Sequence, residues 1–232
     1  MNNIAHFIHA GGFVMYPLLL LSVAAGIVIV ERLLAFRQFG DLSPGLLDQA
    51  IKLCRAGRFD EALRACRQRS GPLAASLAAI IEHRNQPVRE VERIVEEIGQ
   101  DYFIKLERLL PVIDTTTTIS PLLGLLGTII GMVGTFQAIA AQQGKGNNDA
   151  VLNGVGEALY ATATGITIAV ICFMAYNYFA ARLRTVTAET EQAATKLLNA
   201  LTEIHHQERA AHNSTGIGRE EADRGVQTAA RA

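Results

Sequence analysis

Three long hydrophobic runs, each free of charge, divide an otherwise charged chain. They cover residues 13–30, 115–144 and 158–181. Each is at least as long as the roughly 18–20 apolar residues that a helix needs to cross the hydrocarbon core of a bilayer. A backbone in lipid has to satisfy its own hydrogen bonds, so such runs form helices. The pattern predicts an all-α membrane protein with three transmembrane helices.

The polar segment between the first two runs also carries helical patterns. Several stretches between residues 40 and 110 have apolar residues at helical spacing, and the first of them follows Ser43 and Pro44, a typical helix start. The last stretch, residues 88–106, leads directly towards the second run and can continue into it. We expect several helices that pack on one another beneath the membrane.

The segment after the third run changes character along its length. An amphipathic pattern over residues 182–207 extends the third predicted helix beyond the membrane. The last 20 residues are polar and contain glycine, a composition typical of disorder. The third transmembrane helix is therefore expected to continue as a long helix that ends in a disordered tail.

The distribution of Lys and Arg predicts the orientation in the membrane. No basic residue precedes the first run, twelve lie between residues 37 and 109, one lies between the second and third runs, and seven follow residue 181. Basic residues concentrate on the cytoplasmic side of membrane proteins, so the large loop and the C-terminal tail are predicted to be cytoplasmic. The first run lacks a preceding basic region and a cleavage site, which favours an uncleaved helix over a secretory signal.

Composition argues against several other classes of protein. The net charge of −1 and the absence of a lysine-rich run give no indication of nucleic-acid binding. The three cysteines have no CxxC spacing, and the six histidines form no metal-ligand motif. No nucleophile–base pair or phosphate-binding loop is visible. We therefore expect a protein that is not an enzyme and that has neither cofactor nor metal.

The second run carries four glycines at helical spacing, in the segment "PLLGLLGTIIGMVGTF" (121–136). At 100° per residue these glycines occupy an arc of about 80°, whereas the bulky Leu and Ile side chains take the opposite face. The third run repeats this design. Small residues allow another backbone to approach closely in a membrane. The predicted helix-packing residues are Gly124, Gly127, Gly131, Gly134, Ala161 and Gly165.

Polar residues border both strips of small residues. Thr128 lies beside the glycines of the second run, and Thr162 and Glu157 lie on either side of the strip in the third. Ordinary helix dimerisation would explain the glycines alone. The hydroxyls and the carboxylate favour a polar pathway, because ionisable residues in a span usually mark an ion or proton route. Glu157 lies near the outer end of its run, so an interfacial position is the alternative.

The two glycine-containing segments resemble those of a known family. "PLLGLLGTIIGMVGTF" is similar to the P-x-x-G-x-x-G-T-x-x-G pattern of the ExbB/TolQ/MotA proton-channel subunits, and "GVGEALYATATGITIA" (154–169) to their I-x-E-A-L-x-A-T-A-x-G pattern. Three spans with the large loop after the first resemble the ExbB/TolQ branch, and ExbB most. One position departs from the pattern: Ile171 stands where family members commonly carry a proline, which predicts a straighter third helix.

The resemblance implies a function and a set of partners. It implies a homo-oligomeric ring, a pentamer, in the lipid of the bacterial inner membrane, enclosing the helices of a single-span ExbD/TolR-like protein. Protons moving inward through a carboxylate of that partner would drive work on a TonB-like protein for uptake across the outer membrane. Thr128 and Thr162 would line this pathway and Glu157 would lie beside it. The alternatives are a TolQ-like subunit of the Tol–Pal system, a motility stator and a non-conducting oligomeric scaffold.

The predicted organisation along the chain follows from these observations. Residues 2–10 favour a short interfacial helix before the first span. The segments are a periplasmic N-terminal segment (1–12), transmembrane helices (13–36, 113–142 and 155–181), a cytoplasmic helical loop (37–112), a short periplasmic connection (143–154), and a cytoplasmic helical extension with a disordered tail (182–232).

Overall fold

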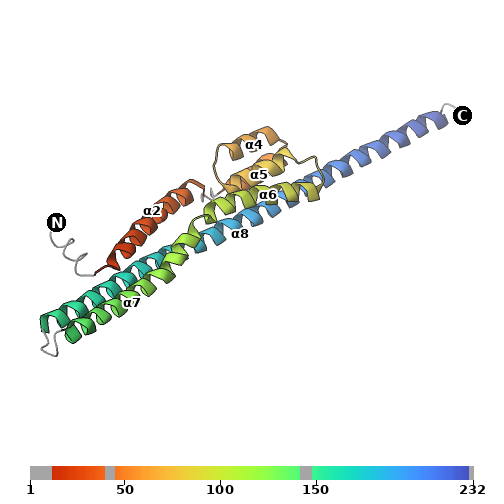
Figure 1. Ribbon diagram of the computed structural model, residues 1–232. Helices are drawn as coiled ribbons and strands as arrows, with labels where there is room; N and C mark the ends of the chain where they lie inside the picture. Colours follow the sequence, from red (N-terminus) through yellow and green to blue (C-terminus); the bar gives the residue numbers. More distant parts are fainter. Residues whose placement is uncertain (1–11, 40–44, 142–147, 230–232) are drawn as a thin grey trace. The chain divides into compact units, whose positions relative to one another are not determined.

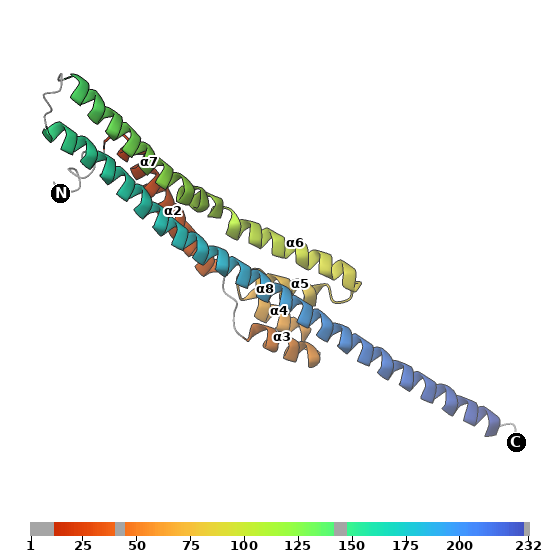
Figure 2. The same cartoon turned by 90° about the horizontal axis from the view of Figure 1, so that it is seen from below.

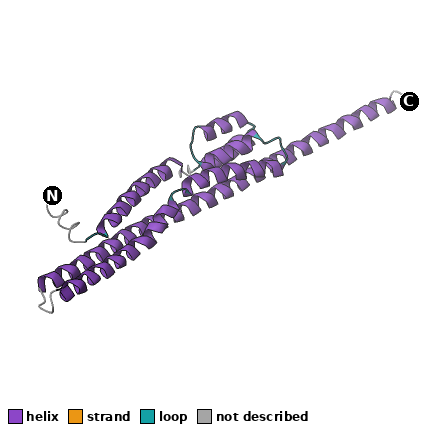
Figure 3. Ribbon diagram, in the orientation of Figure 1, coloured by secondary structure: helices purple, strands orange, loops and turns teal. Residues whose placement is uncertain are grey.

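The computed structural model describes residues 12–39, 45–141 and 148–229. All regular secondary structure in these residues is helical (Figure 3). The described chain forms two compact units, one made of residues 1–37 and 104–184, the other of residues 38–103 and 185–232. The predicted interfacial helix at residues 2–10, the Ser43–Pro44 helix start and most of the outer connection lie outside the described residues.

The first unit contains the three helices that are long and apolar enough to cross a membrane, as far as the described residues go. They are α2 (Met15–Phe39), α7 (Leu110–Ala141) and the first part of α8 (Asn148–Ala229). Figures 1 and 2 both show α7 lying alongside that part of α8. Near its C-terminal end α2 packs on α8 through Phe36 and Phe179, whose rings stack with centroids 5.4 Å apart. The prediction of an all-α membrane protein with three such helices is confirmed.

The second unit has its own hydrophobic core. It contains α3 (Leu46–Arg55), α4 (Phe59–Arg67), α5 (Pro72–Glu82), most of α6 (Val88–Glu107) and α8 from Thr185 onwards. Helix α5 begins with Pro72, which suits the first helical position because its missing N–H is not needed there. Nearly every residue of α5 is buried, and its Leu77 and Ile80 meet Leu197 of α8 in one cluster. The core of this unit is therefore built around α5.

The long helical path from α6 to α7 is interrupted, whereas the sequence pattern allowed a continuous helix. Arg108 and Leu109 form a turn between the two helices. Pro111 accounts for the interruption, because its ring collides with the carbonyl four residues earlier and it has no N–H to donate. The sequence shows this proline, and the structure shows its effect.

The C-terminal segment is part of helix α8, and the disorder expected from its composition stays a prediction. Helix α8 continues to Ala229 and includes nearly all of the last 20 residues. These residues contain no proline to end the helix, and their Ala, Glu, Gln and Arg residues are good helix formers.

Candidate functional site

The glycines of α7 allow this helix to lie in direct contact with α8. A Cβ atom built on Gly124 would lie 3.0 Å from Cα of Thr162, and one on Gly131 would lie 3.0 Å from the carbonyl oxygen of Gly154. A Cβ on Gly127 would come within 2.5 Å of Cβ of Ala161. The distance at Gly127 is shorter than real Cβ atoms show, and those at Gly124 and Gly131 are tighter than most real Cβ contacts, so the absence of a Cβ permits the observed helix spacing.

The strip of α8 that meets these glycines is equally restricted. Ala161 is 1% exposed, and a Cβ on Gly165 would lie 3.2 Å from Cα of Gly124 and even closer to the carbonyl oxygen of Ser120. The two strips of small residues thus face each other within one chain. Gly134 is different, because no described atom lies within 4 Å of a Cβ at that position. Five of the six proposed packing residues therefore meet across the α7–α8 contact.

Thr162 lies inside this contact and Thr128 lies at its edge. The hydroxyl of Thr162 donates a hydrogen bond to the carbonyl oxygen of Gly124 across the two helices, at 3.0 Å. The hydroxyl of Thr128 donates within its own helix, to the carbonyl oxygen of Leu125 at 2.6 Å, and is accessible to the surroundings. Both oxygens retain lone pairs that can accept a hydrogen bond from water or from a protonated carboxyl group.

Most other hydroxyls in the two helices are satisfied locally. Thr116 donates to the carbonyl oxygen of Val112, Ser120 to that of Thr116 and Thr135 to that of Gly131, at 2.7–2.9 Å. This back-bonding to the preceding turn is the usual solution for Ser and Thr inside helices. Among these hydroxyls Thr162 stands out because its partner is on the other helix.

Glu157 lies at a second place, beside the start of α2. A Cβ on Gly12 would overlap the Glu157 carboxylate, so this side chain rests directly against the backbone of Gly12. The amino end of a helix carries partial positive charge, which makes the beginning of α2 a favourable neighbour for a carboxylate. The half-buried Glu157 therefore joins α8 to α2, whereas Thr162 joins α8 to α7. The two residues do not share one point, as their separation of about 140° around the helix predicts.

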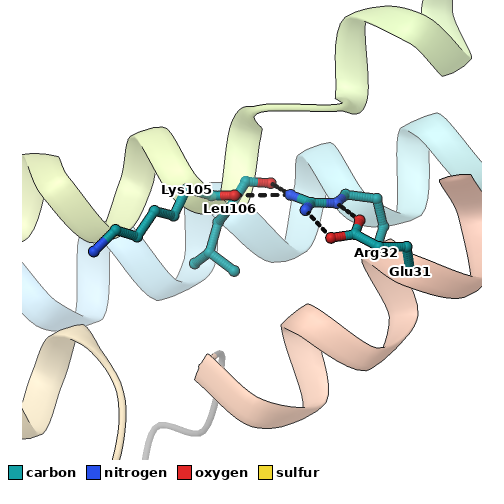
Figure 4. Close-up of polar contacts among 4 residues, drawn as sticks. All are labelled: Glu31, Arg32, Lys105 and Leu106. Atoms are coloured by element: carbon teal, nitrogen blue, oxygen red, sulfur yellow. Dashed lines mark hydrogen bonds and ion pairs between the residues drawn. The ribbon is translucent and has the colours of Figure 1, made fainter.

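A buried arginine that the sequence pattern did not single out joins the second half of α2 to the end of α6. Arg32 is 3% exposed, and its guanidinium donates to the carbonyl oxygens of Lys105 and Leu106 at 2.8 and 2.9 Å (Figure 4). It also donates to both carboxylate oxygens of Glu31, at 2.5 and 2.6 Å. In a continuous helix these two carbonyls would accept hydrogen bonds from the N–H groups of Leu109 and Leu110. The helix is interrupted at this point by the turn at Arg108 and Leu109.

Arg32 thus caps the break between α6 and α7. Helix ends leave carbonyl groups without partners, and a cation is the favourable group to satisfy them. The signal for this role was present in the sequence as a single arginine at the end of an apolar run together with Pro111, but the partner carbonyls become visible only in the folded chain.

Much apolar surface on the three membrane-crossing helices stays uncovered. Only 17%, 22% and 33% of the residues in their most apolar windows are buried, for α2, α7 and α8 respectively. Large side chains such as Leu125, Ile129 and Phe173 are more than half exposed. Such surface suits lipid or further membrane helices. The fold and the contact define a multi-pass helical membrane protein built on a close-packed pair of helices.

Comparison with known proteins identifies the family. The profile described as the MotA/TolQ/ExbB proton channel family matches residues 68–192, which is more than half of the chain. The chain belongs to this family of proton channels.

Individual relatives come from two branches of it. The chain is 29% identical to an ExbB-like biopolymer transport protein of Synechocystis sp. over 171 residues, which are 73% of this chain and 81% of that protein. It is 32% identical to the biopolymer transport protein ExbB of Pseudomonas putida over 167 residues, 65% of this chain and 49% of that protein. It is 34% identical to the Tol-Pal system protein TolQ of Pseudomonas aeruginosa over 106 residues, 43% and 46% of the two chains.

Proposed function

We propose that this chain is the proton-channel subunit of a bacterial inner-membrane complex that converts proton motive force into mechanical work. With an ExbD-like single-span partner it energises a TonB-like protein for uptake across the outer membrane. Five copies form the ring, with the N-terminus outside and the C-terminus in the cytoplasm. Membership of the proton channel family supports this proposal, together with the position of Thr162 between α7 and α8.

The chemistry of the helix pair agrees with this role. The small residues of α7 and α8 already contact each other within the chain. The partner helix therefore docks beside the α7–α8 pair and not against the glycines. There the hydroxyl oxygens of Thr128 and Thr162 accept hydrogen bonds from the partner's protonated carboxyl group or from water, without adding a fixed charge. Glu157 borders the outer end of the same route. Thr162 is the residue on which we base the proposal, because one hydroxyl contacts both helices.

The direct test replaces the Thr162 hydroxyl and keeps its shape. Thr162→Val removes one hydrogen bond between membrane helices, which costs only about 0.6 kcal/mol on average. The variant should therefore fold and assemble normally while proton-driven uptake is lost. Thr164→Val is the matched control, because the Thr164 hydroxyl donates within its own helix, to the carbonyl oxygen of Tyr160 at 2.8 Å. Normal uptake in the Thr162→Val strain would remove Thr162 from the pathway.

A TolQ-like role in the Tol–Pal system is the second candidate, because the match to TolQ of Pseudomonas aeruginosa is as strong per residue as that to ExbB of Pseudomonas putida. The two roles use the same proton chemistry and differ in the protein that receives the work. Deleting the gene separates them: loss of energised uptake with an intact envelope indicates the ExbB-like role, and detergent sensitivity with normal uptake indicates the TolQ-like role.

A further inference from the structure

Helix α7 carries a single charged side chain. Asp114 is its only Asp, Glu, Lys, Arg or His residue, and this side chain is exposed. The helix begins at Leu110 and has no acidic residue in its first turn, the region in which the helix dipole favours a carboxylate. Ionisable residues in membrane-crossing helices are costly and usually mark an ion or proton route. Asp114 therefore needs an explanation other than the stabilisation of a helix end.

The carboxylate of Asp114 has no protein partner among the described residues. The four ion pairs of the described chain all join other residues. The hydroxyl of Thr118 donates to the backbone carbonyl oxygen of Asp114, at 3.5 Å, and not to its side chain. A carboxylate that is exposed and unpaired can bind a proton from water and release it again.

Asp114 lies in line with the proposed pathway. At 100° per residue Asp114, Pro121 and Thr128 are spaced seven residues apart and fall within an arc of about 40°, beside the glycines of α7. Asp114 is exposed, and Pro121 and Thr128 are half-buried. The rise of 1.5 Å per residue places Asp114 about 21 Å from Thr128 along the helix, towards the end that is cytoplasmic in the proposed orientation.

Pro121 adds a free acceptor to the middle of this line. It lies inside α7 and has no N–H, so the carbonyl oxygen of Thr117 loses its helical donor. The neighbouring Ser120 hydroxyl does not replace that donor, because it donates to the carbonyl oxygen of Thr116 at 2.7 Å. In a membrane such a carbonyl is satisfied by a neighbouring helix, a hydroxyl or an ordered water. A water bound there would extend the polar line towards Asp114.

We propose that Asp114 is the proton acceptor at the cytoplasmic end of the pathway, an inference that rests on the proposed function. The partner's protonated carboxyl group gives its proton to water beside α7 and becomes a carboxylate. The proton passes along hydrogen-bonded water to the carboxylate of Asp114, which becomes a carboxylic acid. Asp114 then releases the proton to the cytoplasm and returns to its charged form. One proton crosses, and only O–H bonds are broken and formed.

Substitutions of Asp114 test this role through proton-driven uptake, or through detergent resistance if the chain has the TolQ-like role. Asp114→Asn keeps the size of the side chain but removes the proton-binding group. It should lower the activity about tenfold or more, because water replaces only part of what a positioned proton acceptor contributes. Asp114→Glu retains a carboxylate and should keep most of the activity. Asp101→Asn, at an exposed acidic residue of α6, is the matched control and should leave the activity unchanged.

A strain that lacks the gene separates failure of this inference from failure of the proposed function. If the deletion abolishes the activity and Asp114→Asn retains the wild-type level, Asp114 is not the acceptor and the proposed function stands. Equal loss in Asp114→Asn and Asp114→Glu would also overturn the inference, since the shape of the side chain and not proton binding would then matter. Normal uptake and a normal envelope in the deletion strain would refute the proposed function, and the inference with it.

Discussion

Two Gly→Ala substitutions in α7 separate helix propensity from helix contact. Gly127 faces Ala161 so closely that an added Cβ would lie 2.5 Å from Cβ of Ala161, whereas a Cβ on Gly134 meets no described atom within 4 Å. Both changes gain the same helix propensity, about 0.8–1 kcal/mol. Only Gly127→Ala adds the cost of overpacking, typically about 1–3 kcal/mol, because a Cβ cannot rotate away.

The free energy of unfolding should therefore differ between the two variants, with Gly127→Ala the less stable. We expect Gly134→Ala to be as stable as the wild type or more so, and Gly127→Ala to be less stable than Gly134→Ala by about 1–3 kcal/mol. Unfolding in a titration with denaturing detergent, followed by circular dichroism, measures the difference. Equal midpoints for the two variants would refute the claim that the glycines of α7 are required by contact with α8.

Three further predictions concern other parts of the chain. Arg32→Ala should destabilise the protein by about 2–6 kcal/mol, since two carbonyls lose their donor at about 1–3 kcal/mol each. Ala at the exposed Arg37 should have little effect, and the same denaturing-detergent titration compares the two variants. Gly131→Leu should prevent formation of an oligomer of normal size in size-exclusion chromatography with light scattering, because its side chain would collide with the backbone of α8. Burial raises the pKa of Cys66 from 9.0 to about 11, with a smaller contribution from Cys54, so the folded state keeps the thiol proton that the unfolded state loses. Stability should therefore fall as pH rises from about 9 to 11, and more steeply in the wild type than in Cys66→Ala; equal slopes would contradict the assigned cause.

The membrane-crossing helices could be predicted because their signal is local. A charge-free apolar run of sufficient length has few alternatives to a helix in lipid. The helical character of residues 88–107 was equally visible from spacing, but the break that follows depends on tertiary contact as well as on Pro111. Arg32 has to be buried beside the carbonyls of Lys105 and Leu106 for that break to be capped, and the spacing of apolar residues carries no information about such a partner.

For the candidate site, too, the sequence pattern carries no information about which tertiary partner a residue meets. A helical wheel gives the direction in which Gly134 and Thr128 point, but it does not say whether another helix is present in that direction. Gly134 shares the arc of the other glycines and yet faces open space among the described residues. The wheel also left open whether the small residues accommodate a partner protein or the same chain, and the structure places α8 there. A cavity between α5, α6 and α8 has no counterpart in the sequence pattern, since α8 is far along the chain from the other two helices.

The central claim is that this chain works with a single-span partner that carries a proton-binding carboxylate. Affinity purification of the tagged full-length chain from its native membranes in mild detergent, followed by mass spectrometry, tests it most directly. The account predicts co-purification of a single-span protein with an aspartate or glutamate in its membrane segment, and of a TonB-like protein with it. A homo-oligomer that purifies without any such partner in several detergents would contradict the account and indicate a non-conducting scaffold.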